Sequence, residues 1–391
     1  MFEQSILVIN TGSSSLKFGL YAEKDGDERV LFDGLADGIG QSSGTLEVKD
    51  AAGKTVRSEK IGFVSRHDAL THAAQWLNEL APGKPYAIGH RVVHGGPHLV
   101  THQRITPELV AELQACVHFA PLHIPMALQL IAEAEHAYAD VPQFACFDTA
   151  FHTTMPETAA RFPLSRHLYD EGIRRYGFHG LSYESIVYQL GSKLPSRVVM
   201  AHLGSGASLA AVKDGKSVDT SMGLTPTGGI PMATRTGDLD PGVLLYLQRA
   251  KKMDAESLEK LLNHDAGLKA LSGGISDMRT LQIAADQGDH NAKLAIEVFC
   301  LSIRKFISAY ASVLDGLDML IFAGGIGEHS VRVRSGVCEG LRFLGIAIDK
   351  KNNQAGEGTI SATSSSAQVC IVSSQEDRQI ARHCRAMMRT N

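Results

Sequence analysis

Two arginines and an aspartate stand at positions that suit a binding site for a carboxylate or a phosphate. Arg91 lies near the end of an apolar segment, ahead of a glycine-rich turn, and Arg235 lies in a polar loop before a predicted helix. A guanidinium group can bind two oxygens of one anion at once, although a single loop arginine is also typical of solvated surface. Asp148 directly follows the apolar segment 143–147, and a carboxylate at such a place indicates either metal binding or base chemistry. These residues favour chemistry on an anionic substrate.

Three glycine-rich turns, each placed after an apolar segment, add the features of a phosphate site. They occupy residues 10–17, 202–208 and 324–328. Glycine lets the backbone come close to a ligand, so that N–H groups converge on phosphate oxygens, and Lys17 adds a positive charge to the first turn. A plain tight turn is the alternative for any one of them, whereas three in one chain favour a nucleotide.

Better-known binding motifs are absent from the sequence. The tripeptides at 53–55 and 215–217 look like part of a P-loop, but the glycine required five residues earlier is Val48 in one case and Ala210 in the other. The second tripeptide is better explained as part of a hairpin turn at 213–216. No Gly-x-Gly-x-x-Gly follows a strand and opens a helix. Histidines recur every four residues from 90 to 102, but the Gly-Gly-Pro at 95–97 forbids a helix there, so no zinc site is predicted.

The elements that must position these residues alternate between short apolar runs and helical stretches, which predicts an α/β protein. The predicted strands are 5–10, 16–21, 87–93, 143–147, 197–203, 208–213, 217–221 and 318–322. The predicted helices are 66–80, 106–116, 125–139, 241–250, 255–263 and 291–314. In the last of these, apolar residues from Ile296 through Phe306 to Val313 step by three or four and are expected to share one buried face. Residues 352–366, rich in Gly, Ser and Thr, are expected to form a surface loop.

The sequence contains a faint internal repeat. A strand, a Gly-Ser pair at 12–13 and a returning strand recur as a strand, Gly204-Ser205 and a returning strand. A second similarity is that an apolar strand ends at Phe147, further along the first half, and another ends at Ala323, further along the second half. The repeat predicts two similar halves with a ligand cleft between them.

The composition is that of a globular protein of ordinary charge. The 391 residues are 44% hydrophobic and 20% charged, with a formal net charge of −4. This length favours two domains, and the charge balance calls for neither nucleic acid nor an anionic membrane as partner. No apolar run is long enough for a membrane-spanning helix, and the first ten residues lack the pattern of a secretory signal. Six cysteines without a Cys-x-x-Cys pair indicate buried thiols in a reducing cytoplasm.

Taken together, the motifs resemble the acetate kinase family of short-chain carboxylate kinases, within the ATPase superfamily of actin and the sugar kinases. The resemblance runs along almost the whole chain in family order and rests on NTGSSSLKF, HRVVHGGP, APLH, FDTAFH, YGFHG, HLGSGAS, TRTGDLDPG, SDMR, AGGIGE and SQED. It implies two duplicated actin-like (ribonuclease H-like) domains with the active site in a cleft between them. Domain I would comprise residues 1–149 and 375–391, and domain II, with the nucleotide-binding half and the dimerisation surface, residues 150–374.

The resemblance also implies the reaction and its participants. The expected activity is reversible, ATP-dependent phosphorylation of acetate to acetyl phosphate by direct in-line transfer. ATP or ADP would be a substrate, Mg²⁺ the metal ion, with Mn²⁺ as a substitute, and the enzyme would be a cytoplasmic homodimer.

Roles follow residue by residue from the same resemblance. The catalytic residues would be Asn10, Arg91, Asp148, His179 and Arg235, with His179 stabilising the transition state. The metal would be held by Asn10, Asp148 and Glu376. The nucleotide would contact Lys17, His202, Gly204, Ser205, Gly206, Asp277, Met278, Arg279, Gly325 and Ile326. Acetate would contact Arg91, Val93, Leu122, His123, Phe178 and Pro226.

Three departures from the family pattern and two alternatives stay open. Ser205 stands where Asn is usual, which leaves its phosphate contact open, whereas Met278 in place of Phe and His329 in place of Asn leave the purine preference open. A carboxylate substrate has a pKa near 4 and needs no general base at neutral pH, whereas a sugar kinase needs a carboxylate base, a role that Asp148 could fill. The pair of arginines favours the carboxylate. A propionate or butyrate kinase is one alternative, and a non-kinase nucleotide-dependent module is the other.

Overall fold

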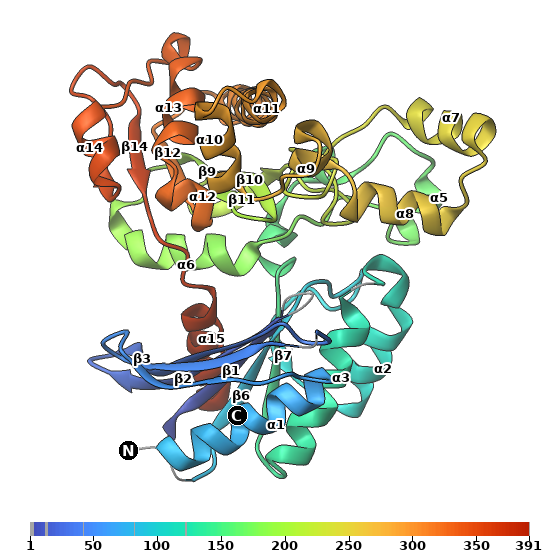
Figure 1. The fold of residues 1–391 in the computed structure, drawn as a ribbon, viewed down its shortest axis with the longest axis vertical. Coiled ribbons are helices and arrows are strands. Elements are labelled where there is room, and N and C mark those ends of the chain that lie inside the picture. The colour runs from blue at the N-terminus through green and yellow to red at the C-terminus, as the bar shows by residue number, and fades with distance from the viewer. Residues whose placement is uncertain (1–3, 12–14, 42, 82, 122, 391) are drawn as a thin grey trace. The chain divides into compact units, whose positions relative to one another are not determined.

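The computed structural model describes residues 4–11, 15–41, 43–81, 83–121 and 123–390 (Figure 1). The chain divides into two compact units. Unit 1 consists of Met1–Ala150 and Gln375–Asn391, and unit 2 of Phe151–Ser374. Each unit is built on one β-sheet that carries helices. No helix in the described ranges is long and apolar enough to cross a membrane.

The sheet of unit 1 has the strand order β5-β4-β3-β2-β1-β6-β8-β7. Its strands are β1 (Ile6–Thr11), β2 (Ser15–Lys24), β3 (Asp27–Asp37), β4 (Thr45–Asp50), β5 (Thr55–Lys60), β6 (Ala87–Val92), β7 (Gln103–Arg104) and β8 (Gln143–Phe147). Strands β1 to β5 form an antiparallel meander, whereas β1, β6 and β8 run parallel. The parallel strands therefore end at the same edge of the sheet.

Helices cover both faces of this sheet. They are α1 (Arg66–Leu80), α2 (Pro107–Ala115), α3 (Ile124–Ala137) and α15 (Glu376–Thr390), with a 3-10 turn at Val117–Phe119. On one face, Trp76 of α1 and Leu130 of α3 join a core cluster with Phe18 of β2. On the other face α15 contacts β1 and β6, and an added Cβ at Gly89 would meet Ile380 of α15 at 2.5 Å. Gly89 thus gives α15 its close approach to the sheet.

The sheet of unit 2 has the strand order β11-β10-β9-β12-β14-β13. Its strands are β9 (Arg197–Leu203), β10 (Ala207–Lys213), β11 (Lys216–Thr220), β12 (Met319–Ala323), β13 (Gly358–Thr359) and β14 (Gln368–Ile371). The predicted hairpin turn at 213–216 is confirmed. Lys213 pairs with Lys216, and the two residues between them, Asp214 and Gly215, both have positive φ.

The helices of unit 2 are more numerous. They are α4 (Glu157–Ala160), α5 (Arg166–Asp170), α6 (Gly180–Leu190), α7 (Pro241–Lys251), α8 (Ala255–His264), α9 (Gly267–Ser272), α10 (Met278–Asp286), α11 (His290–Val313), α12 (Gly324–His329), α13 (Val331–Glu339) and α14 (Lys350–Ala355), with 3-10 turns at Ala150–Thr154, Gly191–Lys193 and Arg342–Leu344. Tyr183 and Ile186 of α6 pack on one core cluster with Val198 and Met200 of β9. Helix α11 contacts β9 and β10 as well as α9, α10 and α13.

Five consecutive strands of each sheet share one topology. The orders β3-β2-β1-β6-β8 and β11-β10-β9-β12-β14 each contain two antiparallel pairs followed by two parallel pairs. The prediction of two similar halves is therefore confirmed. The predicted correspondence between the strand that ends at Phe147 and the strand that ends at Ala323 is wrong, because β8 corresponds to β14 and not to β12. The backbone shows this directly: Asp148 donates its N–H to Val92 in unit 1 as Val372 donates to Phe322 in unit 2, both at 3.0 Å.

All the segments predicted as strands or helices form them, most with ends shifted by a few residues, but three local predictions are wrong. Val313 is half exposed, and the buried face of α11 passes through Ile307 instead of Phe306. The expected loop at 352–366 contains the end of α14 and strand β13, and Asn353 is buried. The expected glycine-rich turn at 324–328 is helix α12, which begins directly after β12.

Candidate active site

Arg91 is the centre of a cluster of oxygen-bearing side chains in unit 1. Its Nη2 lies 2.6 Å from Asp148 Oδ2, and its Nη1 donates to Asn10 Oδ1 at 3.4 Å. Its Nε lies 3.8 Å from Glu376 Oε2. Asn10, Arg91 and Asp148 are brought together because they stand at the ends of the neighbouring parallel strands β1, β6 and β8. Glu376 joins them from the first residue of α15.

The Arg91–Asp148 pair is withdrawn from solvent. The side chain of Asp148 is 1% exposed and that of Arg91 is 18% exposed. Burial acts to lower the pKa of Arg91, but the carboxylates of Asp148 and Glu376 outweigh it and raise that pKa above its ordinary value. Removing one partner of such a pair would leave an uncompensated buried charge, which is strongly destabilising.

Asp377 belongs to the same cluster and was missed by the sequence reasoning, which stopped at Glu376. Its Oδ1 accepts from Asn10 Nδ2 at 2.8 Å, and its Oδ2 lies 2.7 Å from Lys17 Nζ. The Asp377 carboxylate is the main cause of a raised pKa at Lys17. The available signal was the pairing of two acidic residues at the start of a helix.

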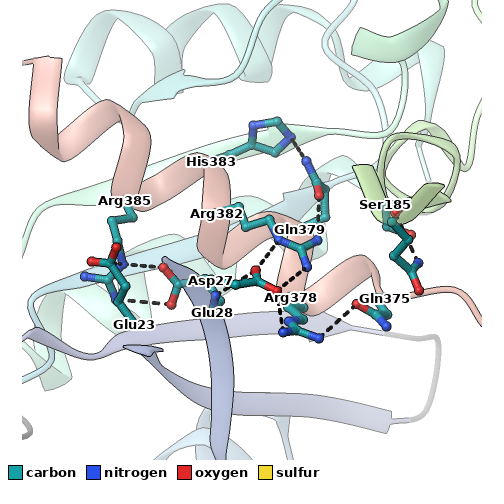
Figure 2. Close-up of polar contacts among 11 residues, drawn as sticks. Glu23, Asp27, Glu28, Ser185, Gln375, Arg378, Gln379, Arg382, His383 and Arg385 are labelled. Atoms are coloured by element: carbon teal, nitrogen blue, oxygen red, sulfur yellow. Dashed lines mark hydrogen bonds and ion pairs between the residues drawn. The ribbon is translucent and has the colours of Figure 1, made fainter. Parts of the chain in front are cut away.

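Helix α15 is fixed to the β2–β3 hairpin by charged pairs, so the position of its first turn is defined. Figure 2 shows Arg378 and Arg382 at Asp27, and Arg385 at Glu28. Arg378 Nη2 lies 2.6 Å from Asp27 Oδ2, and Arg382 Nε lies 2.9 Å from Asp27 Oδ1. Because the turn that carries Glu376 and Asp377 is the start of this helix, these pairs also set where the two acidic residues lie.

The donor set of this cluster fits a hard divalent cation. Asn10 supplies a carboxamide oxygen, and Asp148 and Glu376 supply carboxylates that share Arg91 as their partner. Mg²⁺ prefers oxygen ligands of these types, and Mn²⁺ accepts the same ones. The residues present are therefore suited to such an ion.

In unit 2, the backbone holds His179 in an uncommon conformation. His179 has φ 60° and ψ 24°, the left-handed region, and is the N-cap residue of α6. The preceding carbonyl, of Phe178, lies 3.0 Å from His152 Nε2, and His152 Nδ1 lies 2.8 Å from Ser217 Oγ. Burial lowers the pKa of His152 to about 4, so the neutral ring donates from Nε2 and accepts from the serine hydroxyl. A left-handed non-glycine residue needs such support from its surroundings.

The ring of His179 is oriented by its own contacts. Its Nδ1 lies 2.9 Å from Ser208 Oγ, which also lies 2.6 Å from the hydroxyl of Tyr183. The ring stacks on that of His202, with centroids 4.3 Å apart. His202 Nδ1 is in turn 2.8 Å from Ser182 Oγ.

The Nε2 atom of His179 and the guanidinium of Arg235 flank the backbone of Gly206. A Cβ added at Gly206 would lie 3.3 Å from His179 Nε2 and 3.9 Å from Arg235 Nη1. Arg235 Nη1 donates to the Pro226 carbonyl at 3.1 Å. The neighbouring Ser205 is exposed, and its carbonyl accepts from Ala233 at 3.2 Å. Two groups able to stabilise an anion thus meet at the β9–β10 turn.

In unit 2, the residues expected to contact the nucleotide lie at the ends of β9 and β12 and at the start of α10. Ala323 pairs with His202, so Gly204 at the end of β9 and Gly325 and Ile326 in α12 follow neighbouring strands. The N-terminal cap of α10 is Asp277, which accepts from Thr280, with Met278 buried and Arg279 exposed beside it. Helix α10 is joined to the start of α13 by Gln282, which donates to Ser330 at 3.0 Å.

The residues expected to contact acetate are divided between the units. Val93 and His123 belong to unit 1, and Phe178 and Pro226 to unit 2. Phe178 is 1% exposed and part of the interior of its unit. Leu122 lies outside the described residues. The acetate pocket stays a prediction.

Comparison with known proteins supports one family throughout. The model of the acetokinase family matches residues 5–382. An acetate kinase of Methylocella silvestris is 43% identical over 98% of both chains, and a propionate kinase of Salmonella typhimurium is 39% identical over 96% of this chain and 95% of its own. The crystal structure of Porphyromonas gingivalis acetate kinase matches 98% of this chain and 100% of its own, with a TM-score of 0.88 and 34% identity. This chain belongs to the acetokinase family.

Proposed function

We propose that this chain catalyses the reversible, ATP-dependent phosphorylation of acetate to acetyl phosphate. An acetate oxygen would form a bond to the γ-phosphorus while the bond from that phosphorus to the β,γ-bridging oxygen breaks, and ADP would leave. The acceptor is already ionised at neutral pH, so what must be supplied is neutralisation of charge and in-line positioning. The family membership and the acetate kinase among the relatives support this activity.

The Arg91–Asp148 ion pair is the observation that favours a carboxylate acceptor. In a sugar kinase, the aspartate at this place would have to take a proton from a hydroxyl. Here Asp148 lies 2.6 Å from a guanidinium, and such a partner favours the ionised carboxylate and weakens it as a base. Asp148 is better suited to holding a cation.

Each group then has a defined task in the reaction. Arg91 and Arg235 position acetate and the transferring phosphoryl group, and Lys17 contacts the phosphates. His179 donates from Nε2 to the phosphoryl oxygens as charge develops on them. The glycines at 204, 206 and 325, with Ile326, let the backbone approach the nucleotide. We propose that units 1 and 2 act as domain I and domain II, each supplying half of these groups.

Mg²⁺ would be held by Asp148, Glu376 and Asn10, partly through water. When bound, it neutralises charge on the phosphate oxygens. Arg91 is the partner of these same oxygens in the structure, so we infer that it changes partner to an anionic substrate when the ion binds.

Acyl phosphate captured as its hydroxamate measures the activity directly. Purified protein with MgATP and acetate, propionate or butyrate in parallel should give acetyl hydroxamate at the highest kcat/KM. A higher kcat/KM for propionate would favour the alternative, which the propionate kinase among the relatives supports. One methylene in an apolar pocket changes the rate by only about 10- to 200-fold, so the preference is expected to be partial. No acyl phosphate with any of the three acids would contradict a carboxylate kinase.

We further propose a homodimer formed through unit 2. Helix α7 has no buried residue, and its Val243, Leu245 and Tyr246 are 40%, 47% and 59% exposed. The same unit has a mainly apolar groove of about 510 Å³ lined in part by Leu239 and Phe306. Exposed apolar surface of this kind marks an interface. Light scattering should give a dimer mass, and Leu245→Asp with Tyr246→Asp should give a folded monomer.

The cysteines support a reducing compartment, and we propose the cytoplasm. All six are free and buried. Burial raises the pKa of Cys300 to about 11, so its thiol is protonated and unreactive at neutral pH. Fractionation of the native source with an antibody to this chain would test the location.

A further inference from the structure

Glu328, a residue with no role in the chemistry above, connects two functional segments of unit 2. It lies in α12, the helix that carries Gly325 and Ile326. One oxygen of its carboxylate, Oε1, accepts from the backbone N–H of Gly324 at 3.0 Å and from that of Ser374 at 3.1 Å. A single side chain therefore ties the start of α12 to the last residue of the unit.

Both ends of this connection are fixed by other contacts. Arg334, which is fully buried, donates to the carbonyls of Gly327 and Glu328 at 2.9 and 2.8 Å, and its Nε donates to Asn353 at 2.7 Å. Arg334 thus holds the backbone that carries Glu328. At the start of the same helix, Gly324 has φ +74°, and a Cβ there would lie 2.8 Å from the Leu203 carbonyl, so the close approach of α12 to β9 requires glycine.

The Ser373–Ser374 segment is held from a second side by α6. Gln189 of α6 donates from Nε2 to the Ser373 carbonyl at 3.0 Å. Helix α6 begins after His179, its N-cap residue. Two residues beyond Ser374, the chain reaches Glu376, the expected metal ligand. The segment that leads into Glu376 is therefore held by the helix with the nucleotide residues and by the helix that starts at His179.

We propose that Glu328 is a positioning residue that couples nucleotide binding at α12 to the placement of Glu376. This inference rests on the proposed function of both sites. A nucleotide that contacts Gly325 and Ile326 stabilises α12 and with it the position of Glu328. The hydrogen bond from the Ser374 N–H to Glu328 then restrains the chain that leads into the start of α15. Reciprocity requires that a metal ion on Glu376 favours nucleotide binding in return.

Three substitutions separate this role from simple loss of structure. Glu328→Ala removes both hydrogen bonds. Glu328→Gln keeps an acceptor oxygen of the same reach and should restore most of the behaviour. Glu328→Asp keeps the charge on a shorter side chain, and it serves if the alanine variant does not fold. Glu339→Ala, which removes an exposed carboxylate at the end of α13, is the matched control.

For Glu328→Ala we expect roughly a tenfold rise in KM for ATP and in the Mg²⁺ concentration for half-maximal rate, as for two lost hydrogen bonds to a partly buried carboxylate. KM for acetate should change by less than about twofold, since no acetate contact is altered. In a double-mutant cycle, Glu376→Gln alone raises the Mg²⁺ requirement, and adding Glu328→Ala should raise it no further. Additive effects, or a Glu328→Ala variant with wild-type KM for ATP, would overturn the proposal.

Binding measurements keep this proposal distinct from the proposed activity. Calorimetry with ADP, with and without Mg²⁺, reports the coupling without turnover. If wild-type protein forms no acyl phosphate but its affinity for ADP rises with Mg²⁺ and Glu328→Ala abolishes that rise, the activity fails and the positioning role stands. If the wild type is active and the rise is the same in both proteins, the positioning role fails and the activity stands.

Discussion

Lys17 Nζ lies 2.7 Å from Asp377 Oδ2, and Asp377 Oδ1 accepts from Asn10 at 2.8 Å, so one buried carboxylate orients two groups expected to meet phosphate or metal. Asp377→Asn should keep an acceptor for Asn10 but remove the ion pair with Lys17. We expect KM for ATP to rise and kcat to fall, each by about tenfold, because a charge-assisted contact is lost. Steady-state kinetics at saturating acetate measure both.

Lys17→Met supplies the comparison for this prediction. If Asp377 acts through Lys17, adding Asp377→Asn to the Lys17→Met background should change KM for ATP little. If Asp377→Asn raises KM for ATP as much in the Lys17→Met background as in the wild type, Asp377 acts on the site by another route.

A site residue could be predicted from the sequence where the residues next to it in the chain already made it unusual. Asp148 was predictable because a carboxylate after a run of buried residues is unusual, and Arg91 because it precedes a glycine-rich turn. Asp377 was not, because its importance comes from contacts with Asn10 and Lys17, more than 350 residues earlier in the chain. No local pattern records a contact over that separation.

The same reasoning explains the errors in the fold. Strand β8 was predicted with its observed ends because all five of its residues are buried and apolar or paired. Strand β5, Thr55–Lys60, has no buried residue and five polar or charged side chains, so nothing in its pattern marked a strand; it forms because β4 supplies hydrogen-bond partners. The segment at α12 was expected to be a turn because its three glycines lower helix propensity, but the buried Arg334 binds its carbonyls.

Asp148 and Glu376 should act through the metal. Asp148→Asn or Glu376→Gln is expected to raise the Mg²⁺ concentration for half-maximal rate by at least about tenfold and to lower kcat, because each removes a charged oxygen ligand. Titrating Mg²⁺ at fixed free ATP measures the change. An unchanged Mg²⁺ requirement alongside reduced kcat would assign these carboxylates to direct contacts with substrate.

Arg91→Ala and Arg235→Ala should both lower kcat by about 100- to 1,000-fold, as for removal of a donor to a charged transition state. Their effects on stability should differ. Arg91→Ala leaves Asp148 buried without its partner and should lower the melting temperature, and Mg²⁺ should restore part of it. Arg235 donates to a neutral carbonyl, so Arg235→Ala should melt closer to wild type. Near-normal turnover by either folded variant would remove that arginine from the mechanism.

Gly206→Ala should place a methyl group between His179 and Arg235. The added Cβ would lie 3.3 Å from His179 Nε2, where a phosphoryl oxygen is expected, and Gly206 does not have a positive φ, so the fold should tolerate it. We expect kcat to fall at least about tenfold with little change in melting temperature. Gly223→Ala, whose Cβ would make an ordinary 3.4 Å contact with Phe162, is the control. A fully active Gly206→Ala variant would exclude this space from the reaction.

The stability of unit 1 should fall in mild acid because of His90. The imidazole is fully buried in β6 with Nε2 2.6 Å from Gln143 Oε1, and burial lowers the pKa of His90 from 6.5 to about 4. Between these values the unfolded chain binds a proton that the folded chain does not, so the free energy of unfolding decreases as the pH falls from 6.5, by up to about 3 kcal/mol at pH 4.

Trp76, the single tryptophan, is buried in α1 of the same unit, and its fluorescence in urea reports the unfolding of unit 1. His90→Gln should lower stability at pH 8 but flatten its decline toward pH 5, whereas replacing the exposed His136 with Gln should leave the wild-type slope. A His90→Gln protein that loses stability with pH as steeply as the wild type would show that other groups, and not His90, take up the proton on unfolding.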